Sequence, residues 1–215
     1  MYRPAAFDVA DRDELFDLIE RAAFGHLVTM GKSGFDVTGL PFMVDRDAGP
    51  TGRLRGHFAR ANTQWQAIDG VSALVLFPLA DGYVSPSSYP SKAEHGKVVP
   101  TWNYEVVHVH GTVQIRDDPE WLRTVVTDLT DQHEAARSVE SPWAVTDAPG
   151  DFIDKQLLAI VGIEVQIDSI EGKRKLSQNR SKADRRGAAA ALASSPRPRD
   201  QAVAEAMGRL PDTAS

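Results

Sequence analysis

Apolar and polar residues alternate along most of this chain with the two-residue period of β-strands. The pattern predicts strands at residues 24–30, 35–44, 53–60, 72–80, 101–115 and 161–170. The run at 72–80 is apolar on both faces, which is typical of a central strand. The first two strands flank a turn that includes Lys32 and Ser33, so a hairpin is expected there. Pro41 has no backbone donor, which predicts that its strand is at a sheet edge or is bulged.

Other segments carry apolar residues at helical spacing. We expect helices at 11–22, from Pro119 onward with Asp118 as N-cap, at 151–160, and a short one capped by Asn62 or Thr63. Consecutive strands with helices at the margins predict a mainly β protein with flanking helices, of the α+β class. The expected architecture is a small β-barrel with the helices packed outside it.

Alternation also assigns side chains to the two faces of the long strands. Val107 and Val109 are expected to face the core, whereas His108 and His110 share the opposite face. Such a pair could bind a metal ion with His57 or His95 as the third ligand, but no carboxylate cluster accompanies it. The alternative is two half-exposed histidines beside a polar cavity, and we predict no metal site. In the strand at 161–170, the side chains expected to point outward are Glu164, Gln166 and Asp168.

Composition removes several classes of protein. The chain of 215 residues has no cysteine, which excludes disulfides, thiolate metal sites and cysteine nucleophiles. No run of eighteen apolar residues predicts a membrane-spanning helix, and the first residues lack the apolar core of a signal peptide. We therefore expect a cytoplasmic protein without a membrane partner.

The charge is unevenly distributed. The formal net charge is −6, whereas residues 171–186 hold seven basic and two acidic side chains. This basic segment is where an anion is expected. It could equally contact the acidic residues that follow position 116, within the chain or between subunits.

Two stretches carry candidate chemistry. His57, Ala59, Arg60 and Asn62 end a strand and open a short helix, a junction that suits a phosphate, although Arg60 could instead pair with a surface carboxylate. The long segment at 82–104 is dense in hydroxyl, aromatic, amide and cationic side chains. That mixture favours a planar, polar, anionic ligand over a purely structural loop.

Long sequence strings resemble the PaiB-type family of FMN-binding negative transcriptional regulators of bacteria. The strings are GHFARAN at 56–62, YVSPSSYPSKAEHGKVVPTWNYEVVHVHG at 83–111, WLRTVVTDLTDQHE at 121–134 and IVGIEVQIDSIEGKRKLSQNR at 160–180. The resemblance runs from residue 1 to about residue 187, and it implies a split β-barrel domain over 1–187. The Ala-rich tail at 188–215 lies outside it and is expected to be helical or partly disordered.

The resemblance also implies a cofactor, FMN, and a homodimer with the flavin at the subunit interface. Its implied cofactor residues fall into three groups. The first is His57, Ala59, Arg60 and Asn62, for the phosphate and ribityl chain. The second is Tyr83, Ser85, Ser88, Tyr89, Lys92, His95, Lys97, Trp102 and Asn103 of the strand and signature loop. The third is Lys175, Ser177, Gln178 and Asn179 of the C-terminal signature.

Three functions remain open from the sequence. The resemblance implies a negative transcriptional regulator, but the negative charge and the lack of a helix-turn-helix pattern argue against direct DNA binding. The first alternative is an FMN-dependent oxidoreductase that uses NAD(P)H. The second is a haem- or flavin-handling binding module with one of the histidines as axial ligand. Catalytic residues are not assigned.

Overall fold

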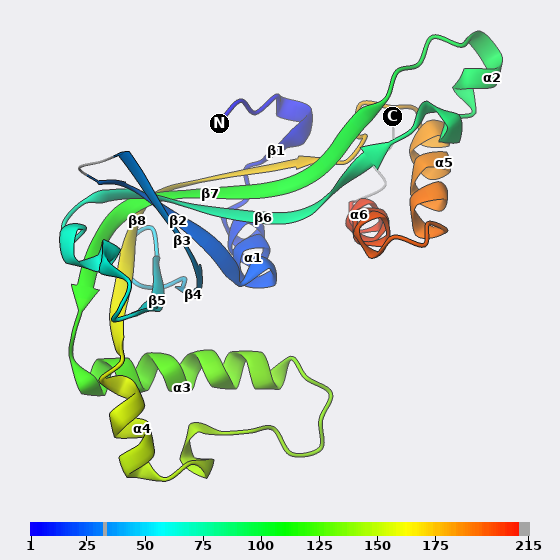
Figure 1. The fold of residues 1–215 in the computed structure, drawn as a ribbon. Helices are drawn as coiled ribbons and strands as arrows, with labels where there is room; N and C mark the ends of the chain where they lie inside the picture. Colours follow the sequence, from blue (N-terminus) through cyan, green and yellow to red (C-terminus); the bar gives the residue numbers. More distant parts are fainter. Residues whose placement is uncertain (32–33, 211–215) are drawn as a thin grey trace. The chain divides into compact units, whose positions relative to one another are not determined.

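The computed structural model describes residues 1–31 and 34–210. The expected turn residues Lys32 and Ser33, and residues 211–215 of the tail, lie outside this range. The strands are β1 (Asp8–Val9), β2 (Phe24–Gly31), β3 (Gly34–Pro41), β4 (Met43–Asp45), β5 (Arg53–Ala59), β6 (Ser72–Val84), β7 (Thr101–Arg116) and β8 (Ile160–Lys175) (Figure 1). The α-helices are α1 (Arg12–Ala22), α2 (Ser91–His95), α3 (Pro119–Ala135), α4 (Gly150–Leu157), α5 (Lys182–Ala193) and α6 (Pro198–Gly208). Short 3₁₀ turns are η1 (Ala5–Phe7), η2 (Thr63–Ala67), η3 (Pro86–Ser88) and η4 (Val145–Asp147).

The strands form one sheet in the order β3-β2-β6-β7-β8-β5-β4, and β1 pairs with β8. The registered pairs are antiparallel, such as β2 with β3 and β5 with β8. The strand expected at 35–44 is divided at Phe42, whose side chain is buried. Its two parts, β3 and β4, are the two edges of the strand order, so the prediction from Pro41 is confirmed.

Local signals place the helix ends. The Asp118 carboxylate accepts from the backbone N–H of Trp121 at 2.8 Å, and Pro119 is the first residue of α3. The Asn62 side chain accepts from the N–H of Gln64 at the start of η2, so the expected cap is present. The segment at 82–100, which has the composition of a long loop, contains the end of β6, then η3 and α2.

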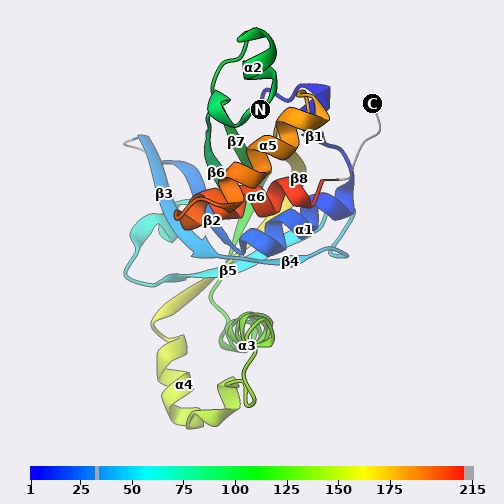
Figure 2. The same ribbon diagram turned by 90° about the vertical axis from the view of Figure 1, so that its right-hand side faces the viewer.

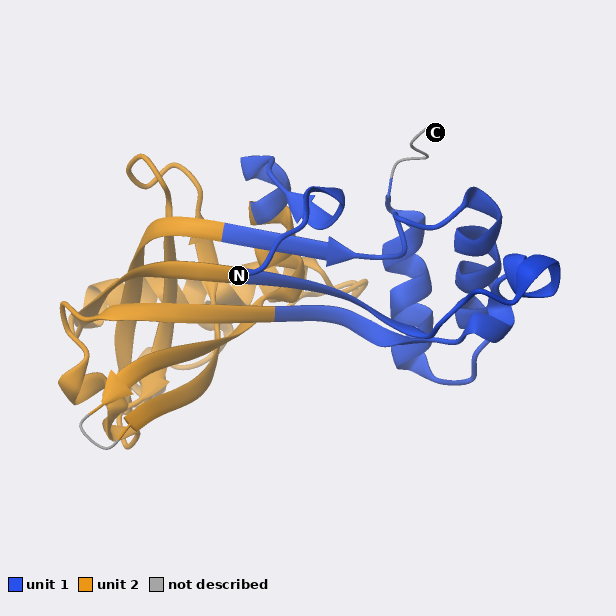
Figure 3. Ribbon diagram, turned by 90° about the horizontal axis from the view of Figure 1, so that it is seen from above, with its two compact units in different colours: residues 1–15, 78–107, 171–215 blue, residues 16–77, 108–170 orange. Residues whose placement is uncertain are grey.

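The chain divides into two compact units, coloured separately in Figure 3. Unit 1 comprises residues 1–15, 78–107 and 171–215, and unit 2 comprises 16–77 and 108–170. The strands β6, β7 and β8 each contribute residues to both units. The boundary expected at residue 187 falls inside α5, and the division at that position stays a prediction.

In unit 1, α5 and α6 pack against each other and share a core with the signature loop (Figure 2). Members of this core are Val84, Tyr89, Leu176, Ala188, Leu192, Val203, Ala206 and Met207. Burying each of the larger side chains stabilises the fold by about 1.5–3 kcal/mol. Although its sequence has only a weak apolar stripe, the tail at 188–210 is therefore part of the core of unit 1.

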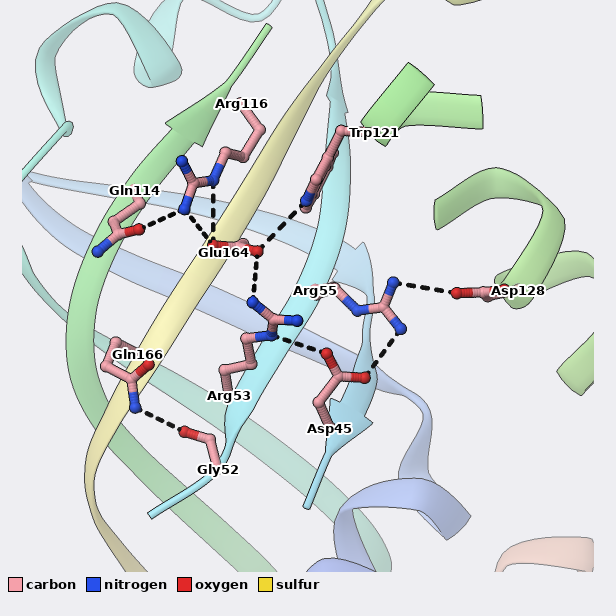
Figure 4. A network of polar contacts seen from close by, with 10 residues as sticks. All are labelled: Asp45, Gly52, Arg53, Arg55, Gln114, Arg116, Trp121, Asp128, Glu164 and Gln166. Carbon is pink, nitrogen blue, oxygen red and sulfur yellow. Dashed lines mark hydrogen bonds and ion pairs between the residues drawn. The ribbon is translucent and has the colours of Figure 1, made fainter. Parts of the chain in front are cut away.

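In unit 2, a network of charged side chains holds α3 over β5 and β8 (Figure 4). Glu164 of β8 is its centre, with ion pairs to Arg53 at 3.0 Å and Arg116 at 2.7 Å. Trp121 of α3 donates to Glu164 at 3.3 Å and lies against Gly162, where a methyl group would overlap its ring. Arg55 joins the same face to Asp128 of α3 at 3.0 Å.

Glu164 points outward from the sheet as expected, yet only 4% of its surface is exposed. Alternation placed it correctly on the face opposite Ile163 and Val165, but that face is covered by α3. A buried carboxylate needs partners to offset the loss of water, and the two arginines and the indole N–H supply them.

Candidate functional site

The two signature stretches of unit 1 meet in a buried polar network. The Asn103 amide donates to the Ser177 hydroxyl at 3.0 Å and to Met207 Sδ at 3.5 Å. Both Asn103 and Ser177 are buried, and Ser177 has a φ of 66°, in the left-handed region that non-glycine residues rarely adopt. A strained backbone next to a buried amide marks a place where local structure is fixed by its surroundings, as at functional sites.

Tyr89 lies in the same core with 3% of its surface exposed. The guanidinium of Arg180 lies over its ring, 5.2 Å from the centroid. Burial raises the pKa of the Tyr89 phenol, which therefore stays protonated at neutral pH. The Ser177 and Arg180 side chains lie near its hydroxyl and partly offset this rise in pKa, but the hydroxyl makes no hydrogen bond of good geometry within the described part of the chain. Buried polar atoms are nearly always paired, so a polar ligand is an expected partner for this hydroxyl.

Three predicted residues line one groove in unit 1. The groove has a volume of about 480 Å³, and Tyr83, Ser85 and Ser88 form one wall. The opposite wall comes from α5, α6 and their connection, with Leu192, Ser195, Arg197 and Asp200 among its residues. An aromatic ring, several hydroxyls and the ion pair of Arg197 with Asp200, together with apolar side chains, suit a planar ligand with polar substituents.

The side chain of Lys175 is bonded to the start of β7, at Thr101 and Trp102. The Lys175 ammonium donates to the carbonyl of Trp102 at 2.6 Å and to the Thr101 hydroxyl. Burial, then the nearby Lys173 and Arg180, lower the pKa of Lys175. The indole N–H of Trp102 donates to the Asp81 carboxylate at 3.0 Å. Its ring lies edge-on to the ring of Tyr83, with 6.5 Å between the two ring centroids.

Other predicted residues of unit 1 have only local contacts in the described chain. Gln178 bonds the backbone of Leu176 and Arg174, which shapes the turn after β8. The Nδ1 atom of His95 accepts from the N–H of Lys97. The side chains that remain exposed are Lys92, His95, Lys97 and Asn179. Their contact with a cofactor stays a prediction.

In unit 2, Arg60 has the ion pair that was the alternative to phosphate binding. Its guanidinium binds both oxygens of Asp117 and donates to the carbonyls of Leu158 and Ile160, each at 2.8 Å. The bond from Arg60 lowers the pKa of the Asp117 carboxyl. These bonds use four of the five N–H groups of the guanidinium, so a phosphate bound by two of them would have to displace one of these acceptors. The neighbouring Ala59 is exposed.

Asn62 belongs to a polar corner that the sequence did not reveal. Its amide donates to the Thr38 hydroxyl at 2.9 Å, and Gln64 bonds Thr29 at 2.9 Å and Thr38. Thr29 and Thr38 lie on the hairpin of β2 and β3, far from Asn62 in sequence. Only the pairing of the strands brings these hydroxyls to the end of β5, so no sequence signal identified them.

The candidate histidines lie on two strands, β5 and β7. Burial lowers the pKa of His57 on β5, so its imidazole is neutral at pH 7, and its Nδ1 completes no hydrogen bond within the described residues. His108 and His110 lie opposite the buried Val107 and Val109, as alternation predicted. Among residues 1–31 and 34–210, no three His, Asp or Glu side chains are grouped to hold a metal ion.

No helix of that range is long and apolar enough to cross a membrane.

Comparison with known proteins adds three findings. A family model described as "Putative FMN-binding domain" matches residues 1–169. The protease synthase and sporulation protein PAI 2 of Bacillus subtilis is 28% identical over 96% of each chain. An uncharacterized protein of Emericella nidulans is 33% identical over 87% of this chain and 88% of its own.

A solved structure shows the same fold. The FAD and haem binding protein from Mycobacterium smegmatis superposes with a TM-score of 0.56 at 18% identity, over 78% of this chain and 73% of that one. This likeness confirms the expected architecture, a mainly antiparallel split β-barrel with flanking helices.

Proposed function

The chain belongs to the FMN-binding domain family, as the PaiB-type signature predicted, and we propose that flavin binding serves transcriptional control. Membership of this family confirms FMN as the predicted cofactor. Bound FMN supplies a ring that accepts and returns electrons. The finer statements, namely which residues hold it, the homodimer and the regulatory role, are proposals.

The residues present fit a flavin. The observation that carries this is the Tyr89 hydroxyl of unit 1, one of the buried polar atoms that complete no hydrogen bond in the described chain. It belongs to a residue predicted from the sequence to contact the cofactor. A flavin offers carbonyl and nitrogen acceptors on its ring, so this hydroxyl has a matching partner on the ligand.

We propose separate roles for the residues of unit 1. In unit 1, the Tyr89 hydroxyl donates to the cofactor, while Tyr83, Ser85 and Ser88 provide a stacking face and hydroxyls along the groove. The Asn103–Ser177 pair keeps the turn after β8 in its strained form beside Tyr89.

A homodimer is supported by one exposed apolar surface of unit 2. The outer face of the β2–β3 hairpin shows Phe24, Met30, Phe35 and Val37 to solvent, each at least half exposed. Phe35 lies opposite Met30 in the register, so the apolar side chains are continuous across the two strands. Contiguous apolar patches of this kind mark interfaces, and β3 is an edge strand free to face a second copy.

A regulatory role without direct DNA contact agrees with where the structure places several cations of the basic segment at 171–186. Lys173 and Arg174 are buried, and Arg174 pairs with Glu105 at 2.9 Å and with Glu14. Lys175 bonds Trp102, and Arg180 covers Tyr89. These cations have partners within unit 1, which supports control through the flavin or a partner protein.

The direct test is a visible absorption spectrum of the protein after incubation with FMN and gel filtration, with the mass measured by light scattering. We expect flavin bands that elute with a dimer-sized peak. A flavin-free protein peak would contradict the cofactor, and a monomer at micromolar concentration would contradict the interface on β2–β3.

Replacing Tyr89 by phenylalanine tests its role. Removing a buried hydroxyl without a partner is expected to stabilise the FMN-free protein by up to about 1 kcal/mol. The same change removes a bond to the cofactor, so the Kd for FMN should rise about five-fold. Fluorescence titration and urea unfolding measure the two effects. Tyr2→Phe, at a residue 82% exposed in the same unit, is the control and should change neither.

A further inference from the structure

Unit 2 contains a pocket that the flavin proposal does not use. It has a volume of about 490 Å³ and is lined by residues at the start of α3 and along α4. These two helices contact each other and are neighbours in Figure 1. Pro119, Leu122, Leu157 and Leu158 give it an apolar lining. Of the residues predicted to contact the cofactor, only Arg60 reaches it, and its guanidinium is occupied by Asp117 and two carbonyls.

The lining is a rigid floor with an exposed apolar rim. Leu122 and Leu157 are buried and belong to a small core with Val145 and Ile153, so the floor is fixed by packing. Leu158, in contrast, is 69% exposed although it lines the pocket. Small-molecule sites are concave, largely apolar and preformed, with a few polar groups that select the ligand. This pocket has the size and lining of such a site.

The charge around the pocket selects the ligand. Asp117, Asp151 and Asp154 stand at its edge with Arg60 and Lys155. Residues 117–158 as a whole carry ten acidic and three basic side chains, so the segment that forms most of the pocket has an excess of negative charge. An anion is disfavoured there, and a hydrophilic solute would not gain from the leucine floor.

The carboxylates at the edge are available to a cation. Asp154 pairs with Arg123, and Asp151 lies 3.8 Å from Lys155, but all four side chains are substantially exposed. Exposed ion pairs are worth only about 0–1 kcal/mol, so a bound cation exchanges with these partners at little cost. We propose that this pocket binds an organic cation with an apolar body, the body on the leucines and the positive charge between Asp151 and Asp154.

Two probes that differ in the sign of their charge test the proposal. Tetraphenylphosphonium and tetraphenylborate have nearly the same size and shape and opposite charges. Calorimetric titration of the full chain should show binding of the phosphonium, weakened by added salt. The borate should bind at least ten-fold more weakly. Binding should be unchanged by saturating FMN, so a failure of flavin binding leaves this result intact.

Variants locate the site. The double variant Asp151→Asn/Asp154→Asn should weaken binding of the phosphonium about five-fold. Leu158→Ser should weaken binding of both probes. The matched control is Asp131→Asn/Glu140→Gln, which removes the same charge from exposed positions of this segment that do not line the pocket. Absent phosphonium binding, a borate that binds as tightly, or an equal loss in the control variant would each overturn the proposal.

Discussion

Replacing Glu164 by glutamine is expected to lower the free energy of unfolding by about 2 kcal/mol. The substitution keeps the shape of the side chain and removes its charge. Arg53 and Arg116 then lose the carboxylate that both contact, at 3.0 and 2.7 Å. Removing one partner of a buried ion pair costs about 3–5 kcal/mol, but both guanidinium groups are more than a third exposed and regain water, which reduces the loss.

Urea unfolding measures this effect as a lower midpoint with an unchanged slope. The control is Asp168→Asn, which removes a carboxylate from an exposed position two residues beyond Gln166 on the same strand. It should change stability by less than about 0.5 kcal/mol. Equal midpoints for the two variants would show that the network does not stabilise unit 2.

Replacing Gly187 by alanine is expected to destabilise unit 1 by about 2 kcal/mol. Helix propensity alone predicts the opposite, a gain of about 1 kcal/mol for alanine inside a helix. Here, however, α5 crosses η3 at Gly187, and an added methyl group would overlap the carbonyl oxygen of Ser88 and crowd Pro90. A backbone carbonyl cannot turn aside as a side chain does, so α5 must move away.

The loss of stability should exceed that of a single contact, because α5 is also bonded to α2, the helix that follows η3. Asp184 of α5 accepts from the Ser91 N–H at 3.1 Å and from the Ser91 hydroxyl at 2.7 Å. Thermal unfolding should show a lower Tm for Gly187→Ala. Gly208→Ala is the matched control, because Gly208 ends α6 with open space around it, and it should leave stability equal or slightly higher. A Tm for Gly187→Ala at or above that of the unchanged protein would contradict the close approach.

Local signals in the sequence were sufficient for several features. Asp118 and Pro119 predicted the start of α3, and Asn62 predicted the cap of η2, because capping joins atoms only two or three residues apart. Alternation predicted which side of β7 carries Val107 and which carries His108, because the period of a strand is fixed by its backbone. The signature strings predicted the family and its cofactor, FMN.

Relations between distant residues were decided only by the tertiary structure. From the sequence, either a phosphate or a surface carboxylate could be the partner of Arg60. Its pairing with Asp117 depends on where β7 ends. It singled out Asn103 and Ser177, but not their bond across 74 positions. It placed Glu164 on an outer face, which α3 then covered. Periodicity tells which residues share a face, whereas the element that covers that face follows from packing of the whole chain, which no local pattern contains.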